Sequence, residues 1–181
     1  MSKVGKKIIM IPEGVEVTLD QNHLTVKGPK GTLSYDLLDG VQLTTEDGHI
    51  AIVVADEEKR NIWGLTRTLV ANMVEWVTHG YEKKLLVMGV GYGAKLEGKR
   101  LILSIGFSHK VNFDVPERIA VSVEQDVKGN SIIILSGIDK QYLGEIAASL
   151  KALKKPEPYK GKGIRYIDEF IKLKPGKTSK K

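Results

Sequence analysis

The same order of elements, several strands followed by one helix, occurs twice along this chain of 181 residues. The apolar spacing over 19–26, Leu-x₄-Leu-x-Val, recurs 77 positions later over 96–103 as Leu-x₄-Leu-x-Leu. A repeat of this length indicates the duplication of one folding unit. We therefore predict an α+β protein of two duplicated domains, 1–81 and 82–155, each a mostly antiparallel sheet packed on one helix. A basic tail over 156–181 follows the second domain.

Alternation of apolar and polar residues predicts the strands of both halves. In the first half, strands are expected at 15–19, 24–26, 33–35 and 49–54, with a weaker strand at Leu43. In the second half, they are expected at 85–90, 101–105, 111–115, 121–123 and 132–135. Gly-containing turns, such as 28–31 and Asp47-Gly48, separate these runs and favour antiparallel pairing.

One helix is predicted near the end of each half. In the first helix, Asp56 is the expected N-cap, Glu57 and Glu58 complement the helix dipole, and Gly80 ends the helix. Its apolar stripe, which we expect to face the sheet, contains Ile62, Leu65, Leu69, Met73 and Val77, and is broadened by Trp63, Val70 and Val74. Asp139 is the expected cap of the second helix, whose apolar positions include Leu143, Ile146, Leu150 and Leu153.

The stretch 156–166, Pro-Glu-Pro-Tyr-Lys-Gly-Lys-Gly-Ile-Arg-Tyr, differs from everything before it. Its prolines and glycines break helices, and it is too polar for a core strand, so we expect exposed backbone. Lys160, Lys162 and Arg165 can bind phosphate oxygens, and tyrosines can stack on bases. Glycine additionally allows the backbone to approach a bulky partner. The alternative interpretation of this 156–166 segment is a solvated basic loop.

Positive charge is concentrated at the same end of the chain. Residues 151–181 contain 11 basic and three acidic side chains, a net of +8. The whole chain has a net charge of +6, so residues 1–150 have a net of −2. This asymmetry indicates a polyanionic partner held at one end of the protein.

Composition excludes several other classes of function. The chain has no cysteine, which excludes disulfides, thiolate zinc sites and cysteine nucleophiles. No apolar run approaches the roughly 20 residues of a membrane span, and 8–11 is too short for the apolar region of a signal peptide. The four histidines, at positions 23, 49, 79 and 109, do not have metal-ligand spacing. We therefore expect a cytoplasmic protein without catalytic residues, cofactor, metal or membrane contact.

The Gly-rich run at 88–94, Met-Gly-Val-Gly-Tyr-Gly-Ala, is the one pattern that suggests an enzyme. It satisfies the dinucleotide-binding pattern G-x-G-x-x-[GA] and follows a predicted strand. That function requires a helix to begin at the run, whereas residues 95–105 contain a turn and an alternating strand. A dinucleotide-binding enzyme is thus the alternative to an RNA-binding protein, and close strand packing is the other explanation of the glycines.

The loop at 106–110, Gly-Phe-Ser-His-Lys, corresponds to the 28–31 turn of the first half. It contains an aromatic ring, a hydroxyl, an imidazole and an amine. It is either a hairpin tip with incidental polar residues or a second nucleic-acid contact.

The 156–166 segment resembles the C-terminal signature of the bacterial large-subunit ribosomal protein six family. The resemblance extends to 137–141, to 106–109 and, near the amino terminus, to 11–15 and 26–31, so that it covers the whole chain. The family usually has Tyr and Pro where Phe107 and Lys110 stand, and often Arg around Lys172.

This resemblance implies a structural ribosomal protein of duplicated α+β domains. Its partners would be large-subunit ribosomal RNA, close to the sarcin–ricin loop and the stalk base where translational GTPases dock, and neighbouring ribosomal proteins. The contacts would come mainly from the C-terminal domain and tail. The residues that we predict to contact RNA are Lys151, Lys154, Lys155, Tyr159, Lys160, Gly161, Lys162, Gly163, Arg165, Tyr166, Lys172, Lys174 and Lys177, together with Ser108, His109 and Lys110.

Overall fold

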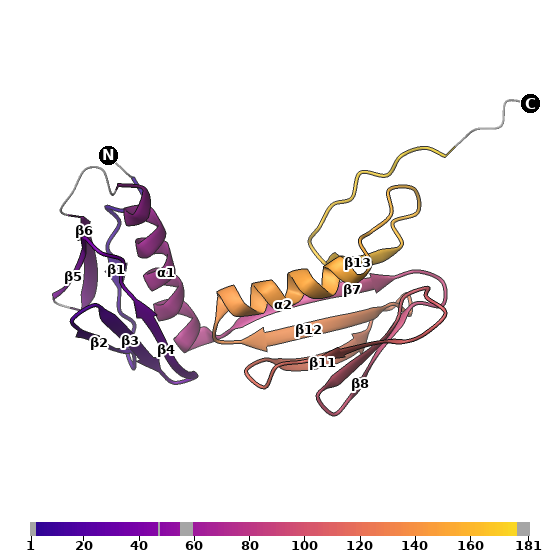
Figure 1. The fold of residues 1–181 in the computed structure, drawn as a ribbon, viewed down its shortest axis with the longest axis horizontal. Helices are drawn as coiled ribbons and strands as arrows, with labels where there is room; N and C mark the ends of the chain where they lie inside the picture. Colours follow the sequence, from indigo (N-terminus) through magenta and orange to yellow (C-terminus); the bar gives the residue numbers. More distant parts are fainter. Residues whose placement is uncertain (1–2, 47, 55–59, 177–181) are drawn as a thin grey trace, which may run out of the picture. The chain divides into compact units, whose positions relative to one another are not determined.

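The structure is a computed structural model that describes residues 3–46, 48–54 and 60–176, drawn in Figure 1. The chain divides into two compact units, which are described separately below. The first unit comprises Met1–Tyr81 with Ile138–Lys140, and the second comprises Glu82–Gly137 with Gln141–Lys181.

The first unit is built from antiparallel sheets and one long helix. Its elements within the described residues are β1 (Ile9–Met10), β2 (Glu16–Asp20), β3 (His23–Gly28), β4 (Gly31–Asp36), β5 (Val41–Glu46), β6 (His49–Val54) and α1 (Arg60–His79). One sheet has the order β1-β6-β5 and the other the order β2-β3-β4. Because α1 contacts β3, β4 and β6, residues of both sheets and of the helix share one hydrophobic core.

The C-terminal end of α1 agrees with the prediction from the sequence. Gly80 has a left-handed backbone (φ 75°) and donates its N–H to the carbonyl of Trp76 at 2.9 Å, which confirms the predicted C-terminal cap. The predicted N-cap at Asp56, with Glu57 and Glu58, lies outside the described residues.

The predicted apolar stripe of α1 is wrong at Leu65, which is 53% exposed, whereas Thr66 is fully buried. The other end of the predicted face is correct, since Val70, Met73, Val74 and Val77 are buried. The indole N–H of Trp63 donates to the carbonyl of Ile52 in β6 at 2.7 Å, which ties the helix to this sheet.

The second unit repeats this plan and adds one strand. Its elements are β7 (Tyr81–Met88), β8 (Gly93–Glu97), β9 (Arg100–Ser104), β10 (Val111–Asp114), β11 (Ala120–Gln125), β12 (Ser131–Gly137), α2 (Lys140–Leu153) and β13 (Gly163–Tyr166). One sheet has the order β11-β12-β7-β13 and the other the order β10-β9-β8. The helix α2 runs alongside the first of these sheets and buries Leu143, Ala147 and Leu150 (Figure 1).

The sheet orders confirm the predicted duplication. The order β1-β6-β5 of the first unit corresponds to β7-β12-β11 of the second, and β2-β3-β4 corresponds to β8-β9-β10. Two of the three repeated apolar positions are core positions in both units, since Leu24 and Val26 are fully buried, as are Leu101 and Leu103. The first repeated position, Leu19 and Leu96, is exposed in both units. The one strand of the second unit without a counterpart among the described residues is β13, and it comes from the 156–166 segment.

The first glycine of the Gly-rich run, Gly89, packs against the ring of Tyr92. No helix begins at the run, because the chain continues directly into β8. A Cβ added to Gly89 would lie 2.8 Å from the ring of Tyr92, and one added to Gly106 would lie 2.7 Å from its hydroxyl oxygen. These glycines therefore make room for Tyr92, and the geometry that a dinucleotide-binding turn needs is absent from this run.

Candidate nucleic-acid interface

The first part of the 156–166 segment is a closed loop organised by Glu157. The N–H of Glu157 donates to the carbonyl of Lys162 at 2.9 Å, and its carbonyl accepts the N–H of Gly161 at 3.0 Å. Its carboxylate accepts the N–H of Lys160 at 2.8 Å. Three hydrogen bonds of one residue thus shape the loop that carries both lysines. Sequence reasoning counted Glu157 only as an opposing charge, and its residue type gives no signal of this role.

The second part of the segment is β13, and the expectation that it is too polar for a core strand is wrong. Gly163–Tyr166 pairs antiparallel with β7, in the register Gly163↔Met88 to Tyr166↔Leu85. Ile164 is fully buried, and its N–H donates to the carbonyl of Lys154 at 2.8 Å. A single apolar side chain is sufficient for this short strand because β7 supplies the backbone partners.

The glycines of the segment are used by the chain itself. Both Gly161 and Gly163 are buried. A Cβ at position 163 would lie 2.7 Å from the carbonyl oxygen of Lys155 and 2.7 Å from the Cα of Pro156. Gly161 has a left-handed backbone (φ 70°), which L-residues with side chains rarely adopt. Packing of the segment on its own backbone, and not only approach to a partner, therefore explains glycine at position 163.

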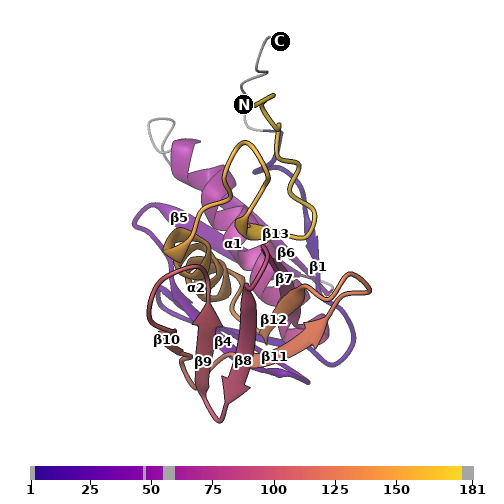
Figure 2. The ribbon, with the colours of Figure 1, turned by 90° about the vertical axis from the view of Figure 1, so that its right-hand side faces the viewer.

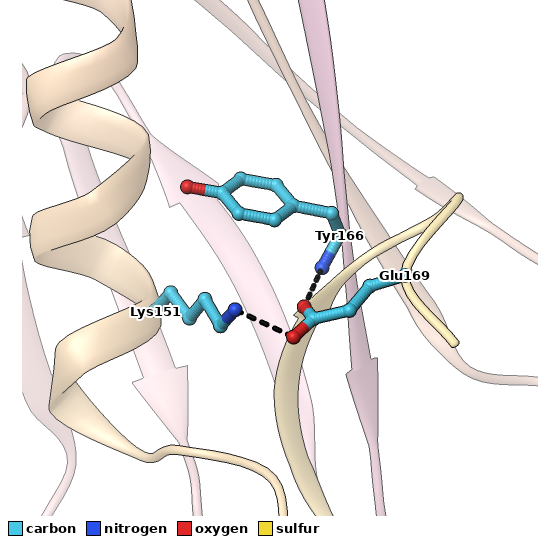
Figure 3. Close-up of polar contacts among 3 residues, drawn as sticks. All are labelled: Lys151, Tyr166 and Glu169. Carbon is cyan, nitrogen blue, oxygen red and sulfur yellow. Dashed lines mark hydrogen bonds and ion pairs between the residues drawn. The ribbon is translucent and has the colours of Figure 1, made fainter. Parts of the chain in front are cut away.

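Glu169 joins the tail to α2, as Figure 3 shows. One carboxylate oxygen accepts the ammonium of Lys151 at 2.7 Å, and the other accepts the N–H of Tyr166 at 3.1 Å. The ammonium groups of Lys151 and Lys83 also lie 4.8 and 4.5 Å from the centroid of the Tyr166 ring. Two predicted RNA ligands, Lys151 and Tyr166, are thus engaged within the chain in this Glu169 cluster.

The tail beyond Glu169 folds back on the loop. The N–H of Lys174 donates to the carbonyl of Pro158 at 2.7 Å. Between Tyr166 and Glu169, the N–H of Ile167 donates to the carbonyl of Lys84 in β7 at 3.2 Å. The described part of the tail is therefore tied to the loop at one end and to β7 at the other.

The remaining predicted contacts differ in how much of each side chain reaches the surface. The exposed residues are Ser108, His109, Lys110, Lys155, Tyr159, Lys160, Lys172 and Lys174, whereas Lys154, Lys162 and Arg165 are half-buried. The Nε of Arg165 is buried and has no hydrogen-bond partner among the described residues. Lys177 lies outside them.

We expect the Glu169 cluster to open in acid. The hydrogen bond from Lys151 lowers the pKa of Glu169 below its ordinary value of 4.5. A carboxyl whose pKa falls on folding stabilises the native state above that ordinary value and loses this effect as the pH falls through its folded-state pKa. Glu169→Gln should therefore lower the free energy of unfolding by up to about 1 kcal/mol at pH 7. The loss is small because the side chains of Lys151 and Glu169 are 25% and 27% exposed, so solvent weakens their ion pair.

Hydrogen exchange at the Tyr166 amide and chemical unfolding, each at pH 7 and at pH 3, would check this expectation. At pH 7 the variant should exchange faster than wild type, and at pH 3 the two proteins should converge. A stability difference that is as large in acid as at neutral pH would show that the charge of Glu169 is not responsible.

Other kinds of site find no support in the described part of the chain. No group of three or more His, Asp or Glu side chains there could hold a metal ion. Neither α1 nor α2, the helices of that part, is long and apolar enough to cross a membrane.

Comparison with known proteins identifies the family. The model of the ribosomal protein L6 family matches residues 11–80 and 88–167. The chain belongs to the ribosomal protein L6 family. A large ribosomal subunit protein uL6 from Alkaliphilus metalliredigens is 49% identical over 183 residues, 99% of this chain and 100% of the relative. The uL6 proteins of Synechococcus elongatus and Clostridioides difficile are each 48% identical and cover 100% of both chains.

Membership of the L6 family confirms the resemblance found in the sequence and the duplicated fold. The first matched stretch lies in the first unit and the second, apart from Ile138–Lys140, in the second unit. The second stretch ends at Ile167, directly after β13. L6 proteins are structural and not enzymatic, so the alternative of a dinucleotide-binding enzyme is wrong.

Proposed function

We propose that this protein is a structural constituent of the large ribosomal subunit in the cytoplasm and supports translation by binding large-subunit ribosomal RNA. The proposed RNA-binding surface lies on the second unit and consists of the 156–166 segment, the tail and the loop at 106–110. The family relationship supports the assignment to the subunit. One observation supports the choice of this surface. Positive charge is concentrated on the ordered loop of the 156–166 segment, which β13 fixes to the sheet β11-β12-β7-β13.

Two features of this surface suit it to RNA. Residues 82–181 contain 20 basic and 11 acidic side chains, a net of +9, whereas residues 1–81 contain eight and 11, a net of −3. In addition, ordering a free backbone costs about 1–2 kcal/mol per residue, and the bonds around Glu157 and Glu169 remove part of that cost before binding. The first unit, which has the opposite net charge, would contact neighbouring ribosomal proteins.

We further propose the location implied by the family resemblance, near the sarcin–ricin loop and the stalk base, in proximity to translational GTPases. A chemical footprint on large-subunit RNA would test this location. Nucleotides of both regions should be protected by the wild-type protein and should regain reactivity when the loop lysines are removed. Protection confined to other regions would contradict the location but not RNA binding itself.

We expect the double variant Lys160→Ala/Lys162→Ala to bind RNA more weakly and with less dependence on salt. Each phosphate contact releases condensed counterions, so losing two contacts should reduce the slope of log K against log salt by about 1–2. The measurement is a salt titration of binding to a large-subunit RNA transcript. Lys27→Ala/Lys30→Ala, which removes the same charge from exposed positions of the first unit, is the matched control and should keep the wild-type slope.

If both double variants lose slope equally, the contribution of Lys160 and Lys162 is general charge and not contact with phosphate. Wild-type slope in both variants would show that the loop lysines remain solvated in the complex.

A further inference from the structure

The loop between β9 and β10 carries two stacked rings beside the end of α2. The centroids of Phe107 and His109 are 5.8 Å apart, and their planes differ by 12°. The ammonium of Lys154, just after α2, lies 4.8 Å from the centroid of the Phe107 ring. In Figure 2 this loop rises from β9 to the end of α2. Two segments that are distant in sequence thus bring a cation and two parallel rings together.

This group of side chains lies at the surface and does not belong to the core. Phe107 is 47% exposed, and His109 is exposed as well. The base of the loop is nevertheless held in place, because Gly106 packs against Tyr92 so closely that a Cβ would lie 2.7 Å from the hydroxyl oxygen. The exposed surface of this aromatic pair is apolar and remains in contact with water. A partner that covers it would gain the free energy of burying that surface.

We propose that Phe107, His109 and Lys154 form a subsite for one unpaired nucleotide of the bound RNA. This inference rests on the proposed function and specifies which part of the RNA this surface takes. A base would stack on the exposed ring pair, and its phosphate would meet the ammonium of Lys154. Bases inside a duplex are already stacked on their neighbours, so they cannot extend the ring pair, and the ligand must be a nucleotide in a loop, bulge or end.

The test compares Phe107→Leu with Phe107→Tyr in the full chain. Leucine keeps an apolar side chain but removes the ring, whereas tyrosine keeps the ring. The probes are a large-subunit RNA transcript and a fully paired RNA duplex, with affinity measured at several salt concentrations. Stacking of one base contributes enough that Phe107→Leu should weaken binding to the transcript about 5- to 100-fold. Phe107→Tyr should bind as wild type does.

Two further readouts separate stacking from charge. Since Phe107→Leu removes no charge, its salt slope on the transcript and its affinity for the duplex should both be unchanged. Ultraviolet cross-linking of the wild-type complex should attach a nucleotide to the peptide that contains Phe107 and His109. Thermal unfolding of each variant is measured first, and His109→Ala, which alters an exposed side chain, replaces Phe107→Leu if the latter is unstable.

Equal affinity of the leucine and tyrosine variants for the transcript would overturn the subsite. An equal loss on transcript and duplex would overturn it too, because a general effect on the surface would then explain the result. The proposed RNA-binding function fails separately, if the wild-type protein does not bind the transcript.

Discussion

Replacing Gly163 with alanine is expected to release β13 from the second sheet and to weaken RNA binding about tenfold or more, without any change of charge. The added Cβ would lie 2.7 Å from the carbonyl oxygen of Lys155 and 2.8 Å from that of Lys154. These neighbours are backbone atoms, so the clash cannot be relieved by a side-chain rotation. The backbone at Gly163 (φ 142°) is also one that alanine rarely adopts. Strain and overpacking together should cost about 2–5 kcal/mol.

The matched control is Gly144→Ala in α2. No heavy atom would lie within 4 Å of a Cβ at this position beyond its own chain neighbours and helix backbone, and alanine is a better helix former. The control should therefore gain about 0.5–1 kcal/mol and keep its RNA affinity. Hydrogen exchange at the Ile164 amide would report β13 directly. Retained protection at Ile164 in Gly163→Ala would show that the segment tolerates the clash. Lost protection with normal RNA binding would show that the ordering of β13 is unimportant for binding.

The second large effect is expected when the two units are separated. A chain of residues 82–181, with its net charge of +9, should keep RNA affinity to within about tenfold of the whole protein. A chain of residues 1–81, with a net charge of −3, should bind about 100-fold more weakly or worse. The measurement is binding to a large-subunit RNA transcript at one salt concentration, after thermal unfolding has verified that each piece is folded.

Salt dependence provides a second check on this division. The 82–181 chain should retain the slope of the full protein, because the phosphate contacts are proposed to lie there. Similar affinity of the two pieces would contradict the assignment of RNA binding to the second unit, and would direct attention to the surface of the first.

Regular elements of this fold could be predicted where one local pattern specifies them. The spacing shared by 19–26 and 96–103 indicated the duplication, and β6 and the C-terminal end of α1 have the predicted bounds. In contrast, β13 could not be predicted, because its sequence offers one buried apolar residue, Ile164. Its stability comes from pairing with β7, whose paired residues are 75 to 81 positions away, and no local pattern reports such a partner.

The candidate site shows a different limit of sequence reasoning. Residue type identified Lys151 and Tyr166 as possible RNA ligands, but the structure provides both with a partner in Glu169. Phe107 was noted only as one member of a polar loop, although its ring lies beside the ammonium of Lys154, which follows α2 and is distant in sequence. Composition can thus locate a basic surface, whereas three-dimensional contacts decide which of its cations remain available to a ligand.

The pairing of β13 with β7 also has a consequence for the order of folding. Until Gly163–Tyr166 has been synthesised, β7 can pair only with β12 and leaves one edge open, although it contains the consecutive apolar residues Leu85, Leu86 and Val87. Closing a loop of this length is entropically slow, so the second sheet should be completed late, after the first unit has formed from local contacts. The last step of folding and the creation of the RNA-binding loop would then be one kinetic event, so that a chain becomes competent to bind only when its sheet is closed.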